Sequence, residues 1–138
     1  RRDEHGIRAK ERYFSPRCID NRWQYQNQPP EFWELFNVDK TNNSHFRIHP
    51  MLHWTEIDIW QYIYKEKIPF VNLYLAKNGK RFRSIGCLPC CEPFNSKADN
   101  IKKIIRELNC TKVCERDGRT QDKENAYTMQ KLRSLGYL

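Results

Sequence analysis

One stretch of the sequence predicts a helix more clearly than its surroundings: residues 55–64 are TEIDIWQYIY. Thr55 can accept a backbone N–H that a helix leaves free at its start, and Asp58 stands three residues later, where a carboxylate completes a capping box. The apolar side chains of this stretch share one face of such a helix: Ile57, Trp60, Ile63 and Tyr64. The stretch therefore predicts an amphipathic helix that packs against a core.

A hairpin and a second helix are predicted downstream. Asn78-Gly79 is a two-residue hairpin signal, and it joins an extended run at 70–75 to a returning strand at 81–85. Ser96 is expected to open the second helix, whose apolar residues again keep helical spacing: Ile101, Ile104, Ile105 and Leu108.

The outer parts of the chain add two further elements. Residues 45–49 alternate in polarity, as in a short strand, and Asp122 can cap a last helix that Gly136 ends. Together these elements predict an α+β fold that is mostly helical, with two or three short strands.

The composition is that of a basic and ordered chain. Its 138 residues include 25 Lys and Arg against 17 Asp and Glu, a formal charge of +8, and 13% are aromatic, which argues against a disordered tail. No apolar run approaches the roughly 20 residues that a membrane-spanning helix needs. No secretion leader is recognisable, so we expect a cytoplasmic protein. Because the sequence starts at Arg1, we interpret it as a piece of a longer protein.

Paired arginines are the first candidate binding groups. Guanidinium groups bind phosphate and sulfate through forked hydrogen bonds that lysine cannot reproduce. Three such pairs occur in the sequence: Arg1-Arg2, Arg81-x-Arg83 and Arg116-x-x-Arg119. They predict an anion-binding site, and the alternative is a solvated basic face.

The six cysteines are the second candidate group. Cys87-x-x-Cys90 and Cys110-x-x-x-Cys114 can supply four thiolates to a structural zinc ion, and an iron–sulfur cluster is a weaker alternative. Otherwise Cys110 and Cys114 are small apolar residues at the end of a helix. His45, His49 and His53 flank Pro50 in an extended stretch, so they do not share a helical face as zinc ligands.

Several segments, taken in order, resemble one enzyme family. The chain is similar to the small subunit of bacterial sulfate adenylyltransferases, within the phosphoadenylyl-sulfate reductase and adenine-nucleotide α-hydrolase group. The segments that carry the resemblance are residues 1–4 (RRDE), 8–12 (RAKER), 53–63 (HWTEIDIWQYI), 81–87 (RFRSIGC), 115–122 (ERDGRTQD) and the Gly136-Tyr137 ending.

The resemblance implies a C-terminal fragment. Residues 1–138 would form a single C-terminal domain of an α/β protein, because the family's Ser-Gly-Gly-x-Asp-Ser loop, which grips the pyrophosphate of ATP, belongs to an upstream nucleotide-binding domain. The fragment alone is expected to be inactive.

The resemblance also implies a reaction and partners. ATP, with magnesium, and sulfate would give adenylyl sulfate and pyrophosphate, and a GTPase large subunit would drive this uphill step. Arg1 and Arg2 are expected near the pyrophosphate. The other four arginines are expected around sulfate and phosphate: Arg81, Arg83, Arg116 and Arg119.

Departures from the family keep other functions open. The connection at Asn78-Gly79 is shorter than in many small subunits, Cys91 stands where threonine is common, and Cys110 and Cys114 are not family features. A reductase is one alternative, although the family's reductases need a cysteine near the C-terminus and none follows Cys114. A basic zinc-binding or nucleic-acid-binding module is the other, with Trp23 and Tyr25 available for stacking on bases.

Overall fold

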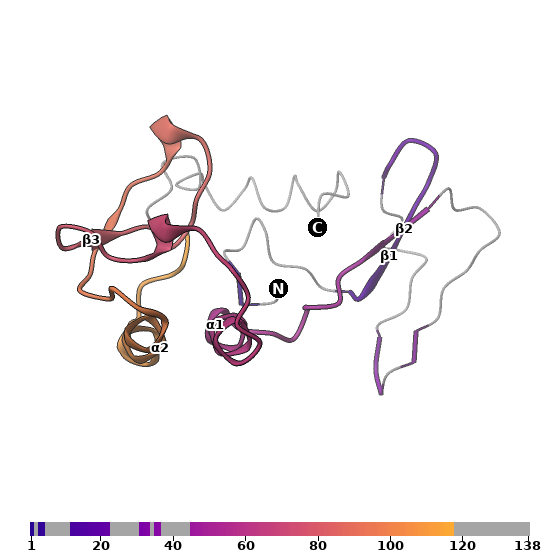
Figure 1. The fold of residues 1–138 in the computed structure, drawn as a ribbon. Helices are drawn as coiled ribbons and strands as arrows, with labels where there is room; N and C mark the ends of the chain where they lie inside the picture. Colours follow the sequence, from indigo (N-terminus) through magenta and orange to yellow (C-terminus); the bar gives the residue numbers. More distant parts are fainter. Residues whose placement is uncertain (2, 5–11, 23–30, 34, 37–44, 118–138) are drawn as a thin grey trace. The chain divides into compact units, whose positions relative to one another are not determined.

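The computed structural model describes residues 1, 3–4, 12–22, 31–33, 35–36 and 45–117. The chain divides into two compact units. Unit 1 comprises Arg1–Arg2, Gly6–His53 and Asn125–Leu138, and unit 2 comprises Asp3–His5 and Trp54–Glu124. Figure 1 shows the described elements of each, and the two units are described here one at a time.

Unit 1 contains a two-stranded antiparallel ladder. Strand β1 (Phe14–Arg17) pairs with β2 (His45–Ile48), so that Phe14 lies opposite Ile48. The strand expected at 45–49 is thereby confirmed, one residue shorter than predicted. The Glu31 carboxylate accepts the backbone N–H groups of Tyr13 (2.6 Å) and Phe14 (2.9 Å), which lie at the start of β1.

Helix α1 (Glu56–Lys65) of unit 2 begins where the sequence predicts it. The Thr55 hydroxyl accepts the backbone N–H of Asp58 at 3.3 Å, and the Asp58 carboxylate accepts the backbone N–H of Thr55 at 2.8 Å. The predicted capping box is therefore confirmed. Trp60 is the buried residue of this helix.

Helix α2 (Ile101–Cys110) begins later than predicted. Its N-cap is Asn100, whose side chain accepts the backbone N–H of Lys103 at 3.0 Å and whose backbone is extended. The expectation that Ser96 opens the helix is wrong, because the Ser96 hydroxyl is instead hydrogen-bonded to the Glu107 carboxylate and accepts the backbone N–H of Ala98.

The predicted turn is present, but its strands pair differently. Asn78 (φ 54°) and Gly79 (φ 77°) both have left-handed backbones, as a tight hairpin turn requires, and Lys77 bridges to Lys80 across it. Strand β3 (Lys80–Arg81) then pairs with β4 (Phe94–Asn95), and the run before the turn holds a short 3-10 helix, η2 (Asn72–Tyr74). Strand β3, which follows the turn, thus pairs with a strand later in the chain and not with the run before the turn.

The core of unit 2 lies between its two α-helices, which pack against each other (Figure 1). Trp60, Ala98 and Ile104 form its buried centre. The Trp60 ring makes edge-to-face contacts with Phe70 and Tyr74, each at 5.4 Å between ring centroids. These ring contacts add to the aliphatic packing around Ile104 in the core of the unit.

The fold class is confirmed at the level of α+β. The described residues contain two α-helices of ten residues and four short strands rather than two or three, and a mostly helical content is not confirmed. The last helix predicted, at 122–135, lies outside the described residues. Within the described part of the chain, neither helix has the length and apolar character needed to cross a membrane.

Candidate functional site

Arg81 is buried in unit 2 and points its guanidinium group at a helix. Its Nε and Nη2 donate to Oε1 of Glu107 on α2, at 3.0 and 2.7 Å, and the same carboxylate is hydrogen-bonded to the Ser96 hydroxyl. Only 1% of Arg81 is exposed. A charge removed from water in this way needs both a counter-charge and hydrogen-bond partners, and Glu107 supplies both.

Arg83 makes the corresponding contact with the other helix. Its Nε donates to Glu56 Oε1 at 3.3 Å and its Nη2 to Glu56 Oε2 at 2.6 Å, which is the parallel, forked geometry of a bidentate pair. Nη1 donates to the backbone carbonyl of Val113 at 2.7 Å, and the guanidinium carbon lies 5.6 Å from the centre of the Phe94 ring. Arg83 therefore joins α1, β4 and the segment after α2.

These contacts use the donors that an anion would need. The arginine-x-arginine motif ties the β3 segment to both helices, and this structural function was not predicted. The anion-binding role of Arg81 and Arg83 stays a prediction. The spacing of Glu56 and Glu107 along their helices gives no signal that these carboxylates meet buried arginines.

The other predicted anion ligands are distributed between the two units. Arg1 lies in unit 1 and is half-buried, whereas Arg116 lies in unit 2 and is buried. Arg2 and Arg119 lie outside the described residues. The structure thus brings Arg81, Arg83 and Arg116 into one unit.

The predicted metal ligands are arranged as a pair and two separate thiols. Cys87 and Cys90 form a disulfide, and Cys110 and Cys114 are exposed free cysteines. Among the described residues, no three His, Cys, Asp or Glu side chains are grouped so that they could hold a metal ion. The four cysteines as placed do not fit a zinc ion, so no metal-dependent step is derived from them.

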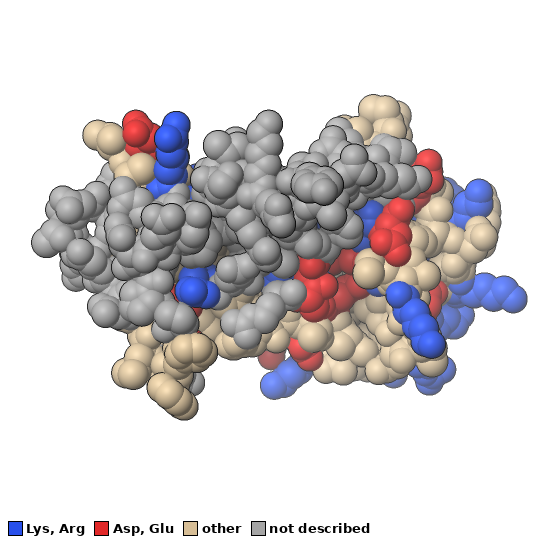
Figure 2. All heavy atoms as spheres, turned by 180° about the vertical axis from the view of Figure 1, so that it is seen from behind, with Lys and Arg blue, Asp and Glu red and all other residues tan. Residues whose placement is uncertain are grey.

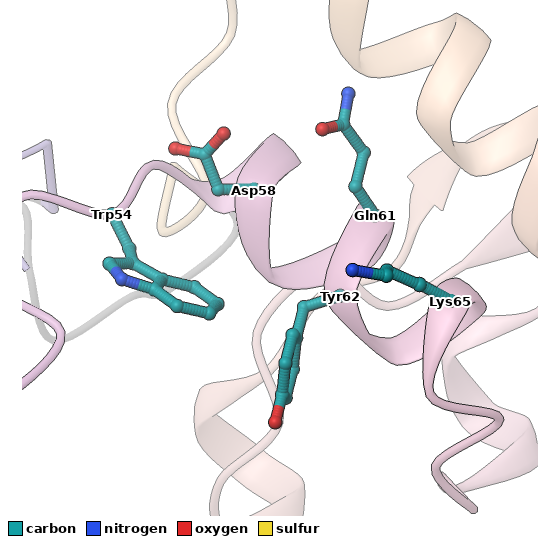
Figure 3. A pocket seen from close by; sticks show the side chains of 5 residues that line it. All are labelled: Trp54, Asp58, Gln61, Tyr62 and Lys65. Atoms are coloured by element: carbon teal, nitrogen blue, oxygen red, sulfur yellow. The ribbon is translucent and has the colours of Figure 1, made fainter.

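A hollow of about 370 Å³ lies along the exposed side of α1. Figure 3 shows its lining, with the Trp54 and Tyr62 rings near each other and the Lys65 side chain above Tyr62. The two rings meet edge to face at 5.2 Å. Hydrogen bonds from Thr55 lower the pKa of the Asp58 carboxyl, so this side of the hollow carries a negative charge at neutral pH. The prediction from apolar spacing missed this feature because Gln61 and Tyr62 lie off the apolar face.

The charged surface is mixed in sign. Figure 2 shows one face of the molecule, on which the Lys and Arg side chains of the described residues are interspersed with Asp and Glu. A nucleic-acid backbone is bound most strongly by a continuous basic surface. The nucleic-acid-binding module therefore stays a prediction that these charges do not decide.

Comparison with known protein families shows the family of the chain. The family described as the Phosphoadenosine phosphosulfate reductase domain matches residues 1–93. The chain belongs to this family. The match includes the Arg83–Glu56 pair and the Cys87–Cys90 disulfide, whereas Glu107 and the rest of α2 lie beyond it.

Several curated relatives of the chain have the same name. Proteins called Sulfate adenylyltransferase subunit 2 are 39% identical in Geobacter metallireducens, 38% in Geotalea uraniireducens and 37% in Colwellia psychrerythraea, each over 166 aligned positions. The alignments cover 99% of this chain and 55–56% of the relatives. The chain thus spans about 55% of the length of these relatives, and the predicted family resemblance is confirmed.

Proposed function

We propose that this chain is part of a sulfate adenylyltransferase, which forms adenylyl sulfate and pyrophosphate from ATP and sulfate. The observation that carries the proposal is the 37–39% identity, over 99% of this chain, to proteins named Sulfate adenylyltransferase subunit 2. Because the chain spans little more than half of those proteins, the activity is proposed for the longer protein and not for residues 1–138 alone.

The reaction makes few covalent demands on the protein. A sulfate oxygen attacks the α-phosphorus of ATP, and pyrophosphate leaves with the electrons of the broken P–O bond. Catalysis then depends on holding two anions in line and on neutralising the charge that develops. Magnesium is proposed to arrive with ATP, as part of the substrate.

The arginines divide into two proposed roles. We assign Arg1 and Arg2 to the pyrophosphate, and Arg116 and Arg119 to sulfate and the α-phosphate. Arg81 and Arg83 are proposed as positioning residues, because their guanidinium groups already pair with Glu107 and Glu56. Through those pairs they fix the β3 segment against α1 and α2, and this rigidity would keep neighbouring ligands in place.

The proposal includes a partner and a cell compartment. The name subunit 2 supports a second subunit, and we propose a GTPase large subunit, since forming adenylyl sulfate is strongly uphill and needs an energy source. We place the assembly in the cytoplasm.

The decisive experiment uses the longer protein that contains this chain. It is incubated with ATP, magnesium, labelled sulfate, pyrophosphatase and the GTPase subunit, and labelled adenylyl sulfate is measured. We expect product only when GTP is present. Absence of product would overturn the proposal, and thiol-dependent release of sulfite from adenylyl sulfate would assign the protein to the reductases instead.

The arginine assignment has its own control. Arg119→Gln in the longer protein should lower the rate of adenylyl sulfate formation about a hundredfold, the usual cost of losing one donor to a developing anion. Lys112→Gln, an exposed residue of the same charge in the segment after α2, should keep the rate of the unaltered protein. Equal rates for the two variants would refute the assignment of Arg119.

A reductase is the second candidate function. Two observations favour it: the matched family is described as a reductase domain, and the chain contains a disulfide between Cys87 and Cys90. The same assay separates the candidates, because a reductase consumes adenylyl sulfate and releases sulfite, whereas the adenylyltransferase produces adenylyl sulfate.

A further inference from the structure

The Cys87–Cys90 disulfide closes a small ring within one loop. Residues 82–93 connect β3 to β4, and the short 3-10 helix η3 (Leu88–Cys90) turns the chain so that the two Cα atoms are 5.4 Å apart. The backbone N–H of Cys90 also donates to the carbonyl of Cys87 at 3.1 Å. The hydrogen-bonded turn therefore brings the two cysteines close together within one segment of the chain.

This ring is a poor structural cross-link. A disulfide stabilises a fold chiefly by restricting the unfolded chain, and the restriction is smallest for the shortest loops. Here the ring contains four residues, and both cysteines belong to the same loop, so the bond joins no distant elements. Cys-x-x-Cys is also the spacing found in disulfide oxidoreductases.

The two sulfur-bearing residues differ in accessibility. Cys87 is exposed, whereas Cys90 is buried with 8% of its surface accessible. Leu88 beside them is 90% exposed, so an apolar contact point stands next to the accessible cysteine. A reagent in solution therefore meets Cys87 first and would release Cys90 into the protein interior.

A third cysteine lies next to the pair. Cys91 is half-buried, and its Sγ accepts the backbone N–H of Gly86 at 3.0 Å. The hydrogen bond fixes Cys91 at the base of the ring, since Gly86 directly precedes Cys87 in the chain. Cys91 therefore offers a nearby control for the specificity of the pair.

We propose that Cys87 and Cys90 form a thiol–disulfide exchange site whose substrate is an external dithiol. One thiolate of the dithiol attacks Cys87 Sγ, a mixed disulfide forms, and the Cys87–Cys90 bond breaks with Cys90 leaving as a thiolate that takes up a proton. The second thiol of the reagent then attacks the mixed disulfide, so Cys87 is released as a thiol and the reagent becomes a disulfide. Two electrons and two protons pass to the chain.

The proposal is tested first on the unaltered, purified chain with dithiothreitol as the dithiol. Alkylation of the free thiols with iodoacetamide before and after reduction, followed by peptide mass analysis, should show Cys87 and Cys90 protected before and alkylated after. Reoxidation with glutathione disulfide should restore the protection. Free thiols at both positions after that reoxidation would overturn the proposal.

Two single variants test the direction of attack. In Cys90→Ser, Cys87 should react with 5,5′-dithiobis-(2-nitrobenzoate) at least about tenfold faster than Cys90 reacts in Cys87→Ser, because thiol reactivity follows exposure. The rates are read on the peptide that carries each cysteine, and Cys91→Ser and Cys110→Ser are controls that should leave the Cys87–Cys90 pair intact. Equal rates at Cys87 and Cys90 would refute the proposed asymmetry.

One further outcome would replace the proposal with another site. Zinc that copurifies with the chain, and that must be removed by a chelator before Cys87 and Cys90 can be alkylated, would show that the two thiols hold a metal. None of these measurements uses ATP, sulfate or a partner subunit, so their failure is distinct from failure of the proposed adenylyltransferase function.

Discussion

Arg83 and Glu56 form a two-pronged ion pair between the segment that follows β3 and the first turn of α1, with nitrogen–oxygen distances of 3.3 and 2.6 Å. The side chains of both residues are largely buried, at 5% and 14% exposed. A pair of this kind carries a large penalty when only one partner is removed, because the other charge stays buried without compensation. It therefore offers the most direct test of the arrangement of unit 2.

Glu56→Gln should lower the free energy of unfolding by about 3 kcal/mol, the usual cost of breaking a buried ion pair. The measurement is urea-induced unfolding at neutral pH. Glu66→Gln is the matched control, because Glu66 lies at the exposed end of α1 and is 4.0 Å from Lys65. The control should change stability by less than about 0.5 kcal/mol. Equal effects of the two substitutions would contradict the buried pair.

Arg81→Gln should destabilise unit 2 by about 2 kcal/mol, which is less than the effect of Glu56→Gln, because the Glu107 side chain that loses its counter-charge is 31% exposed and water compensates part of the loss. Arg106→Gln changes an exposed arginine next to Glu107 on α2 and should cost less than about 0.5 kcal/mol. Urea unfolding in the absence of ATP and sulfate checks both values. If Arg81→Gln unfolded like the unaltered chain, the pair with Glu107 would contribute nothing to stability and the assignment of Arg81 as a positioning residue would be wrong.

Thr55→Ala should cost about 1 kcal/mol at neutral pH, because it removes the N-cap of α1. Part of this cost depends on pH. The backbone N–H and hydroxyl of Thr55 lower the pKa of Asp58 in the folded chain, so their contribution is present above the ordinary aspartate pKa and is lost as pH falls through the lowered value. The difference between the two chains should shrink as pH falls from about 5 to about 2.

Gln61→Ala controls for a general effect of acid on α1. Gln61 is exposed on the same helix and takes no part in the capping box. Its substitution should change stability little at any of these pH values. A Thr55→Ala cost that stayed constant down to acid pH would show that the hydrogen bond from the Thr55 hydroxyl to the Asp58 carboxylate contributes nothing to the cap, because the backbone N–H of residue 55 still binds Asp58 in the variant.

Gly79→Ala should destabilise the chain by about 1 kcal/mol even though an added Cβ meets no atom within 4 Å. The reason is the backbone, since Gly79 has φ of 77° and side chains other than glycine rarely adopt that conformation. Asn78→Gly is the matched control at φ 54°, where glycine is accommodated without strain, and it should leave thermal stability nearly unchanged. Equal melting temperatures for Gly79→Ala and the unaltered chain would contradict a strained turn.

Local signals predicted local structure well. The capping box at Thr55 and Asp58 and the turn at Asn78-Gly79 are correct because each depends on side-chain and backbone preferences within four residues. The apolar spacing correctly predicts helix α2. The predicted start at Ser96 is wrong, because the Ser96 hydroxyl is hydrogen-bonded to Glu107, a residue eleven positions away. A cap signal cannot show such a competing partner.

The contacts between residues far apart in the sequence were not predicted. Nothing in the spacing of Arg83 indicates Glu56, 27 residues earlier, or links β3 to β4 across a twelve-residue loop. Arginine pairs beside glycine have the same local sequence pattern whether they bind an anion or a buried carboxylate. Which of the two they bind depends on the tertiary fold. The Cys87-x-x-Cys90 spacing predicts metal ligands, whereas the structure has a disulfide there, because cysteines at this spacing suit a disulfide as well as a zinc ion.

The Asn78-Gly79 turn also has an evolutionary consequence. The aligned relatives extend over 166 positions against 138 residues here, so they contain residues that this chain lacks. The tip of the hairpin is exposed, and a Cβ at Gly79 would meet no neighbouring atom within 4 Å. Lys77 and Lys80 pair beneath it, so an exposed tip of this kind tolerates a change of chain length better than the paired residues do.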